Sequence, residues 1–292
     1  MSAIAALLPD GRLHLQHGPI DCLCRAWGDP GEVQAAYGQA AVFFAGVLDD
    51  LCAELPVLRS PLPAPLPTGS VARAMHAACR PFADRFITPM AAVAGAVADA
   101  VLAAMVKGRD LSRGFVNNGG DIAFHLTPGS SLRCGLVTDL ASAFDGPAGL
   151  ASDGTFLLTF DHPARGLATS GRACKGRGGR SFSFGIADSV SILARTAAQA
   201  DAAATIIGNA VDLAGHPAID RRPASDIDPA SDLGGRLVTF DVGPLDRGAI
   251  EAALDGGETM ADMLLGHGLI EGAVLVLRSR FRVLSPSLME VA

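Results

Sequence analysis

Aromatic residues and positive charge are both scarce in this chain. Only 5% of its 292 residues are aromatic, so alanine, valine and leucine must fill the core of a protein that is 49% hydrophobic. The formal net charge is -7, which excludes the chain-wide basic footprint of a nucleic-acid or anionic-membrane protein. Any site for an anionic ligand must therefore be a local cluster of basic residues.

Several motifs that identify large enzyme classes are also missing. None of the six cysteines forms a Cys-x-x-Cys pair, and no cysteine–histidine spacing is that of a zinc finger. There is no Gly-x-Gly-x-x-Gly after the first strand, no phosphate-binding loop of the form Gly-x-x-x-x-Gly-Lys-Ser/Thr and no Gly-x-Ser-x-Gly. We therefore expect neither a doubly wound dinucleotide fold nor a serine hydrolase. The first residues have no basic segment and their apolar run is too short for a signal peptide, which predicts a cytoplasmic protein.

One apolar run, Pro89–Val106, is long enough to raise the question of a membrane helix. It consists mostly of small residues and contains Asp99, and Thr88 before it and Gly108 after it are typical ends of a helix in water. Gly95 and Asp99 are four residues apart and share a helix face. The run thus predicts a buried helix whose small residues let a neighbouring backbone approach closely.

The order of the expected elements predicts a mixed α/β fold in a single domain of residues 1–292. Residues 1–55 read as an N-terminal strand-helix segment with two strands joined at Gly18, and proline-rich residues 56–69 as a stiff extended connector. Strands and long helices then alternate without a strict β-α-β rhythm, which favours an α+β mixed sheet with packed helices. Further strands are expected at 114–117, 122–126, 132–137, 155–160, 166–169, 190–194 and 236–242, helices at 70–79, 197–215 and 245–267, a loop at 216–235 and a closing hairpin around 278–280.

The segment Asn117-Asn118-Gly119-Gly120-Asp121 allows two interpretations. Asn-Gly favours the positive φ angles of a two-residue hairpin turn, so the segment can be an ordinary tight turn. Two consecutive glycines also leave bare amides that a ligand can approach, and Asp121 adds an acceptor for a ribose hydroxyl, a ring N–H or a metal. Asn118, Gly119 and Gly120 are therefore candidate ligand-binding residues, and Asp121 is a candidate catalytic residue.

A glycine-rich basic segment, residues 166–190, stands out in an acidic chain. It is either a solvated loop or a cradle in which backbone amides and guanidinium groups bind a phosphate, and we favour the cradle. Its candidate ligand-binding residues are Thr169, Ser170, Gly171, Arg172, Lys175, Arg177, Arg180, Ser181 and Ser183. Asp188 follows and is a second candidate catalytic residue, which would orient a reacting group.

Asp201 and Thr205 are four residues apart in an expected helix that begins at the capping box of Thr196 and Gln199. A carboxylate and a hydroxyl on one open face suit a hard cation such as Mg²⁺. Water and a substrate phosphate would complete the coordination shell of the ion. The same spacing fits an aspartate that complements the helix dipole and a threonine that bonds back to a carbonyl. Spacing alone favours this second, purely structural interpretation.

The motifs ITPMAAVAGAVAD, VNNGGDI, GLATSG with RSFSFGIADSVSILA, and ADAAATIIGNAV occur in this order. In this order they resemble a family of uncharacterised ApbE-like proteins of bacteria and archaea, relatives of the ApbE flavin transferases, which move FMN from FAD onto proteins with Mg²⁺. The resemblance covers nearly the whole chain and implies an ApbE-like, T-fold-like architecture. It implies that Asp201 and Thr205 are metal ligands, and that the ligand cradle contains Gly119, Gly120, Asp121, Thr169, Ser170 and Gly171.

The chain departs from the flavin transferases at one interval. Where they carry a histidine and an Asp-Pro-x-Thr-Gly stretch, this chain has RACKGRGGRSFSFGIAD, with neither, which argues against flavin transfer to a protein. The leading hypothesis is therefore a metal-assisted enzyme, of the transferase or pyrophosphatase type, or a binding protein, for a phosphate-bearing nucleotide-like ligand such as FAD or FMN, with Mg²⁺ as cofactor.

Two other classes of function stay open. One is a non-catalytic carrier in sulfur or cofactor metabolism. It would use the same pocket, or Cys174, because nearby basic residues lower the pKa of a thiol. The other is a structural subunit with an inactive site. No nucleic-acid or membrane partner is expected in any of these, and a homodimer is compatible with all of them.

Overall fold

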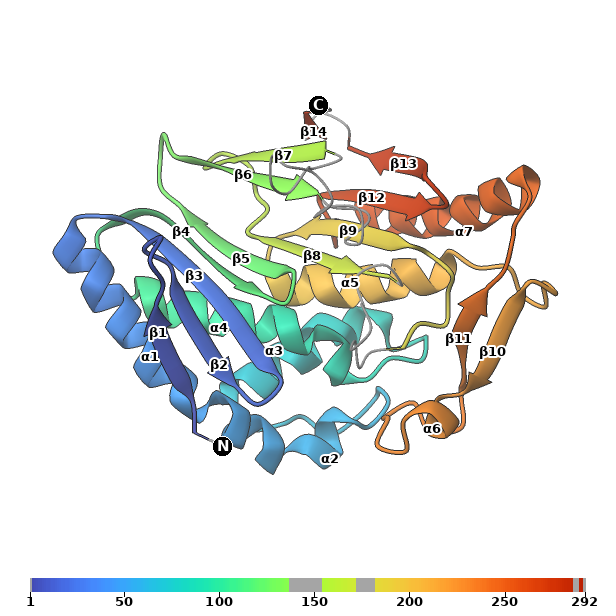
Figure 1. The fold of residues 1–292 in the computed structure, drawn as a ribbon, viewed down its shortest axis with the longest axis horizontal. Coiled ribbons are helices and arrows are strands. Elements are labelled where there is room, and N and C mark those ends of the chain that lie inside the picture. Colours follow the sequence, from blue (N-terminus) through green and yellow to red (C-terminus); the bar gives the residue numbers. More distant parts are fainter. Residues whose placement is uncertain (1, 137–153, 172–181, 286–288, 291–292) are drawn as a thin grey trace. The chain divides into compact units, whose positions relative to one another are not determined.

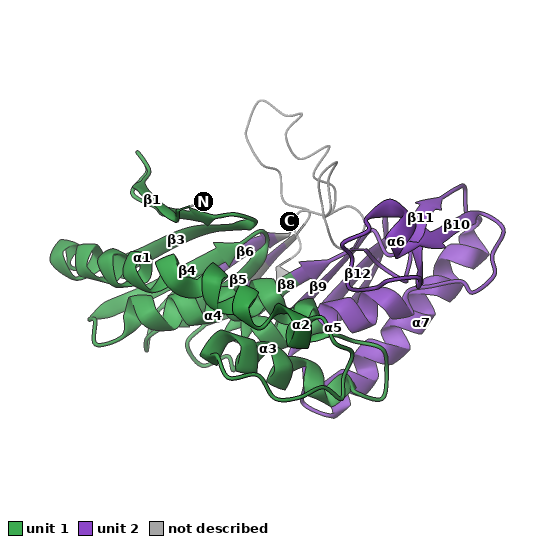
Figure 2. Ribbon diagram, turned by 90° about the horizontal axis from the view of Figure 1, so that it is seen from below, with its two compact units in different colours: residues 1–132, 158–168, 193–202 green, residues 133–157, 169–192, 203–292 purple. Residues whose placement is uncertain are grey.

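The computed structural model describes residues 2–136, 154–171, 182–285 and 289–290. The chain separates into two compact units, which Figure 2 shows in different colours. Unit 1 comprises residues 1–132, 158–168 and 193–202, and unit 2 comprises residues 133–157, 169–192 and 203–292. Several strands and one helix cross the boundary between these ranges, so both units draw on the middle of the chain.

An antiparallel sheet forms one layer of unit 1 (Figure 1). Its strands pair in the order β1, β2, β3, β4, β5 and β8, each antiparallel to the next. Their bounds are Ile4–Leu7, Leu13–His17, Ile20–Gly28, Leu111–Asn118, Asp121–Leu126 and Gly166–Ser170. Alternate side chains of β2 and β3 are buried, because one face of the sheet packs against helices. The two strands predicted on either side of Gly18 are thus confirmed, and β1 is a strand that the sequence did not reveal.

The helices of unit 1 pack on this sheet. The long α1 (Pro30–Ala53) contacts β2 and β3, and α4 (Val93–Val106) contacts β4, β5 and α1. A 3-10 turn, η2 (Pro89–Ala92), leads into α4, while α2 (Leu55–Leu58), α3 (Ser70–Cys79) and η1 (Arg80–Phe82) connect α1 to it. By length and composition the stretch Pro89–Val106 could cross a membrane, but 50% of it is buried inside the protein. Its contacts make it the core helix that the sequence predicts.

Two segments differ from the sequence-based expectation. The proline-rich connector is not extended throughout, because α2 includes its first residues and holds Pro56 in the first turn, where proline needs no N–H partner. The expected loop 216–235 contains strand β10 (Ile219–Pro223) and helix α6 (Ala224–Ile227). The residues of β10 are exposed or half-buried and show no hydrophobic alternation, so the sequence carries no strand signal there.

Unit 2 holds a second group of strands and the last long helix. In it, β9 is adjacent to β12 and β12 to β13, β10 pairs with β11, and β14, β7 and β6 form a further group. The bounds are Ser131–Leu136 for β6, Gly154–Thr159 for β7, Ser189–Ala194 for β9, Leu237–Val242 for β11, Gly272–Leu277 for β12, Arg280–Leu284 for β13, Met289–Glu290 for β14, Ala197–Ala210 for α5 and Arg247–Gly266 for α7. Arg278 and Ser279 join β12 to β13 with φ angles of 49° and 60°, as a two-residue hairpin requires. The closing hairpin and the mixed α/β class are therefore confirmed.

Gly95 determines how closely α4 approaches the beginning of α5, whose first residues belong to unit 1. A Cβ atom on Gly95 would lie 2.2 Å from the carbonyl oxygen of Ala197, a separation that real Cβ atoms do not show. Gly166 of β8 approaches the same turn, since its Cβ would lie 2.1 Å from the nitrogen of Ala197. The close approach predicted from the small residues of α4 thus occurs, and the neighbouring backbone is the first turn of α5.

We predict that Gly95→Ala destabilises the protein, although alanine is the better helix former. The added methyl group overlaps backbone atoms that cannot move aside, so we expect a loss of about 1–3 kcal/mol in the free energy of unfolding. Gly38→Ala in α1 is the matched control, because a Cβ atom there meets nothing within 4 Å. That control should gain up to about 1 kcal/mol from helix propensity. Chemical denaturation of both variants measures the difference, and equal gains in both would contradict the close approach.

Candidate functional site

The turn between β4 and β5 has the backbone of a tight hairpin. Asn118 pairs with Asp121 across it, and Gly119 and Gly120 have φ angles of 65° and 110°. The amide of Gly120 donates to Oδ1 of Asn117 at 2.8 Å. Cβ atoms on the two glycines would meet nothing within 4 Å, so glycine is needed here for its φ angle and the turn faces open space. The tight-turn geometry therefore leaves the backbone of both glycines approachable, although the Gly120 amide is already bound to Asn117.

Two buried polar side chains flank the glycines. Asn118 is 7% exposed and Asp121 is 8% exposed. The Nδ2 group of Asn118 donates to the carbonyl oxygen of Ala94 at 3.1 Å, which ties the turn to the first turn of α4. Since buried polar groups require hydrogen-bond partners, this contact fixes the position of the turn.

Asp201 contacts the same first turn of α4 from the other helix. Its Oδ2 atom accepts the backbone amide of Gly95 at 3.1 Å, and the neighbouring amide of Ala94 also acts to lower the pKa of its carboxyl group. These amides belong to the helix N-terminus, where N–H groups lack intrahelical partners and the dipole favours negative charge. Because the carbonyl of Ala94 and the amide of Gly95 belong to one peptide unit and point in opposite directions, Asn118 and Asp201 bind the two ends of that unit, within unit 1.

Asp99 makes the reciprocal contact. It lies on α4, and its two carboxylate oxygens accept the amides of Ala197 and Ala198 in the first turn of α5 at 3.0 and 2.9 Å. Each helix thus supplies the carboxylate that caps the other. Sequence reasoning noted the spacing of Gly95 and Asp99 but assigned Asp99 no role. The sequence does carry a signal for this role. An aspartate follows a glycine by one turn, in a helix that a neighbouring backbone is expected to approach.

Burial raises the pKa of both carboxyl groups. The pKa of Asp99 rises to about 6 and that of Asp201 to about 7, although the backbone N–H groups act in the opposite direction. The charge of Asp99 contributes further to the raised pKa of Asp201. Within the described part of the chain, no arginine or lysine forms an ion pair with either group. The charged forms of these carboxylates therefore lack a cationic partner among those residues.

Thr205 lies one turn after Asp201 on α5, so the two side chains share a helix face. It is half-buried, and its hydroxyl forms no hydrogen bond within the described residues. By contrast, the helical Thr259 donates to the carbonyl oxygen of Asp255 at 2.8 Å. The aspartate half of the purely structural interpretation is thus seen at the N-terminus of α4 and not of α5, while the return bond of Thr205 is not seen among the described residues.

Protein side chains alone do not form a metal cage in the part of the chain that the structure describes. No group of three or more His, Cys, Asp or Glu residues is positioned to hold an ion there. Mg²⁺ is usually held by one or two carboxylates, with water and substrate phosphate completing its octahedron. Asp201 and Thr205 together fit this mode of binding. They do not fit a site in which protein side chains supply every ligand of the ion.

The other candidate residues are found in unit 2. The hydroxyls of Thr169 and Ser191 are 2.9 Å apart, and Ser170 directly precedes Gly171, which has a φ of 135°. A Cβ atom on Gly171 would lie 2.4 Å from the carbonyl oxygen of Asp188, so only glycine fits.

Two further unit 2 candidates have defined partners. Oγ of Ser183 is 3.3 Å from Oδ1 of Asn209, and Oδ2 of Asp188 accepts the backbone amide of Arg278 at 2.6 Å. Asp188 is thereby fixed to the turn between β12 and β13. Six other candidates lie outside the described residues. They are the basic residues, the cysteine and one serine of the segment: Arg172, Cys174, Lys175, Arg177, Arg180 and Ser181.

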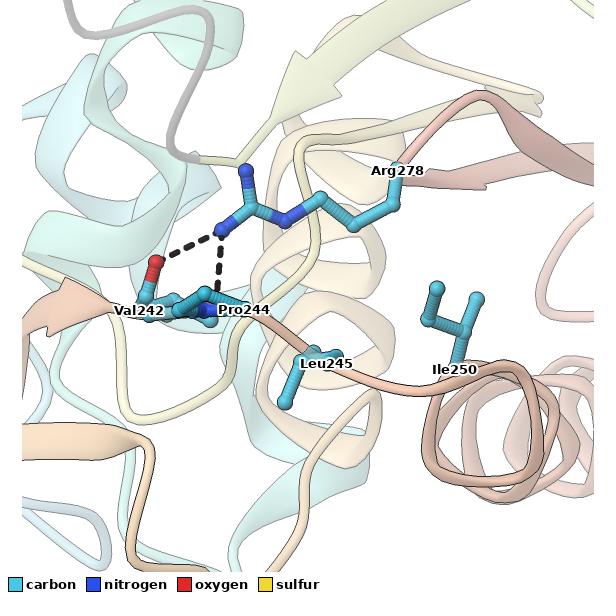
Figure 3. Close-up of a pocket in the computed structure, with 6 residues that line it drawn as sticks. Val242, Pro244, Leu245, Ile250 and Arg278 are labelled. Carbon is cyan, nitrogen blue, oxygen red and sulfur yellow. Dashed lines mark hydrogen bonds between the residues drawn. The ribbon is translucent and has the colours of Figure 1, made fainter.

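A cavity of about 410 Å³ lies elsewhere in unit 2 (Figure 3). It is lined by Val242, Gly243, Pro244, Leu245, Ile250 and Arg278. The guanidinium group of Arg278 donates to the carbonyl oxygens of Val242 at 2.6 Å and Gly243 at 3.2 Å, which Figure 3 shows as dashed lines. Its lining contains none of the candidate residues that the sequence indicated.

The pKa of Asp99 predicts a pH-dependent stability, measured in a chelating buffer. The unfolded carboxyl titrates near 3.8, whereas the folded one titrates at about 6, so the folded state holds its proton more tightly. The resulting stabilisation is complete below pH 3.8 and is lost as the pH rises through 6. Asp99→Asn cannot ionise, so the stability of wild type relative to this variant should fall between pH 4 and 7 by on the order of 2 kcal/mol. Denaturation curves across this range test it, and a constant difference would refute the raised pKa.

Comparison with known proteins places the chain in a family. The family described as "AbpE bacteria" matches residues 5–283. The UPF0280 protein of Methanospirillum hungatei JF-1 is 37% identical over 136 residues, which are 46% of this chain and 50% of that protein. The UPF0280 protein of Methanocorpusculum labreanum is 34% identical over 183 residues, 62% of this chain and 70% of that protein. The chain thus spans about half the length of the first relative.

Two solved structures are similar to the chain at 14% sequence identity. The ApbE protein of Thermotoga maritima MSB8 has a TM-score of 0.35, with 90% of this chain and 78% of that chain covered. The flavinyl transferase ApbE of Pseudomonas stutzeri, in its apo form, has a TM-score of 0.40, with 98% and 95% covered. The resemblance to uncharacterised ApbE-like proteins is confirmed by the family match and the UPF0280 relatives together: this chain belongs to the "AbpE bacteria" family and to the UPF0280 proteins.

Proposed function

We propose that this protein binds a phosphate-bearing, nucleotide-like ligand of the FAD or FMN kind, with a Mg²⁺ ion on Asp201 and Thr205. The observation that supports it most is the position of Asp201. Its carboxylate lies at the first turn of α4, which also holds the glycine turn through Asn118. Two motifs that the sequence separates by about eighty residues therefore bind the opposite ends of one peptide unit, that of Ala94 and Gly95, in unit 1.

The occupied helix end explains why the proposal includes a cation. The N-terminal amides of a helix can bind phosphate directly, but here the carboxylate of Asp201 accepts the hydrogen bond of the Gly95 amide. A phosphate that approached this carboxylate unaided would be repelled by it. A divalent ion held by Asp201 and Thr205 would remove this repulsion and neutralise the charge of a diphosphate. Thr205 supplies a hydroxyl on the same helix face as Asp201, and this hydroxyl forms no hydrogen bond within the described residues.

The turn at Gly119 and Gly120 supplies the other half of the proposed site. Both glycines adjoin open space, so a planar ring or a ribose can approach the backbone closely. Asp121 is the buried acceptor at the end of this turn, and we propose that it orients the group that reacts or is recognised. Flavin nucleotides are the first ligands to test, because the family to which the chain belongs resembles the ApbE flavin transferases.

The proposal predicts a Mg²⁺-dependent thermal shift. FAD, FMN and ATP are each titrated into the protein, once with Mg²⁺ and once with a chelator. At least one nucleotide should raise the melting temperature when Mg²⁺ is present and not when the chelator is present. At a hundredfold excess over the dissociation constant the stabilisation is about 2.7 kcal/mol. If FAD is the ligand, chromatography of the mixture then shows whether it stays intact or is cleaved to FMN and AMP.

Matched variants assign the shift to the proposed residues. Asp201→Asn and Thr205→Ala should remove the Mg²⁺-dependent part of the shift. Asp262→Asn, an exposed carboxylate on α7, and Thr259→Ala, a helical threonine that does bond back, should leave it unchanged. The proposal is abandoned if no nucleotide gives a shift with Mg²⁺, or if all four variants retain it.

A further inference from the structure

We propose that Asp99 is the positioning residue of the Asp201 site, which it serves without touching ligand or ion. By capping α5 it holds the carboxylate of Asp201 against the first turn of α4. This inference rests on the proposed function, because it concerns the same site. It adds a residue that neither the sequence motifs nor the family resemblance assigns.

Asp99 determines the geometry of the first turn of α5. Asp99 binds the amides of Ala197 and Ala198 with one oxygen each, at 3.0 and 2.9 Å, and so fixes both the position and the rotation of the first turn. Asp201 follows Ala197 by four residues, about one turn of 3.6 residues, and so lies on the same side of the helix. A rotation of the first turn would therefore move the carboxylate of Asp201 directly.

The contacts of Asp99 and Asp201 form a closed ring between α4 and α5. Asp201 binds the amide of Gly95, and Asp99 follows Gly95 by four residues on α4. The ring therefore runs from Gly95 to Asp99 along one helix, across to Ala197, along α5 to Asp201 and back. The two helices are too close at Gly95 to slide, since even a methyl group would overlap there. A change at Asp99 would therefore reach Asp201 through this ring of contacts.

Asp99 could affect the proposed cation site either through its position or through its charge. A second carboxylate near a cation also attracts it through space, so loss of Asp99 has two explanations. Asp99→Glu keeps the charge but moves the oxygens outward by one methylene group, whereas Asp99→Asn keeps the length and removes the charge. If Asp99 acts by position, both variants weaken the site. If it acts by charge, only the asparagine variant does.

These variants should still fold. Oγ1 of Thr196 accepts the amide of Gln199 at 3.1 Å, so α5 retains a cap of its own when Asp99 is changed. A matched control exists in α7, where Asp246 caps the amide of Ala249 at 2.8 Å. Asp246→Glu and Asp246→Asn make the same changes at another helix start, in unit 2, and contribute nothing to the proposed site.

The test uses Mn²⁺ as a spectroscopic substitute for Mg²⁺, since the two ions prefer the same oxygen ligands. Electron paramagnetic resonance measures free Mn²⁺ in titrations of the full chain, alone and with FAD. Loss of a residue that orients a metal ligand typically weakens metal affinity about 10- to 100-fold, and we expect this for Asp99→Glu and Asp99→Asn. The Asp246 variants should stay within about twofold of wild type. Wild-type affinity in Asp99→Glu would overturn the proposal.

A second readout needs no ligand. Hydrogen exchange of the Gly95 amide, followed by NMR, reports the bond that this amide makes to Asp201. Both Asp99 variants should speed this exchange, and the Asp246 variants should not. Unchanged exchange in the Asp99 variants would refute the positioning role, whatever the wild type binds. If wild type binds no Mn²⁺ while the exchange responds as expected, the proposed function fails and the coupling of Asp99 to Asp201 stands.

Discussion

The reciprocal capping of α4 and α5 is the interaction on which the site depends. Asp99 of α4 binds the first amides of α5, and Asp201 of α5 binds the first turn of α4. The two helices can meet in this way because Gly95 removes the side chain at their closest point. Two anionic groups are thus held by helix N-termini, in surroundings that disfavour their charge. A cation would relieve that cost, and this connects the architecture to the proposed ligand.

The fold could be predicted where the sequence carries periodicity or turn chemistry. The core helix Pro89–Val106, the strands around Gly18 and the closing hairpin at Arg278 all have such signals, and the structure confirms them. β10 could not be predicted, because a half-exposed strand needs no hydrophobic alternation. The helical turn at Pro56 was missed because proline is usually read as a helix breaker, although it is tolerated in the first turn.

The candidate site could be predicted only in part. The spacing of Asp201 and Thr205 showed that they share a helix face, but it could not show that the aspartate caps a different helix or that the threonine makes no return bond. The meeting of Asn118 with Ala94 is a tertiary contact between residues twenty-four positions apart. Asp99 was visible as a charge in an apolar helix, yet its role depends on where α5 begins in space. Local patterns thus name candidate residues, and only packing selects among them.

A crystal structure of the full chain with Mg²⁺ and FAD tests the central claim most directly. The account predicts an ion about 2.0–2.1 Å from a carboxylate oxygen of Asp201 and from Oγ1 of Thr205. It also predicts ligand density between residues 118–121 and 201–205, with Asp99 still bound to the first amides of α5. Ligand density away from these residues, or an Asp201 carboxylate that keeps only its amide partners in the presence of both ligands, would contradict it.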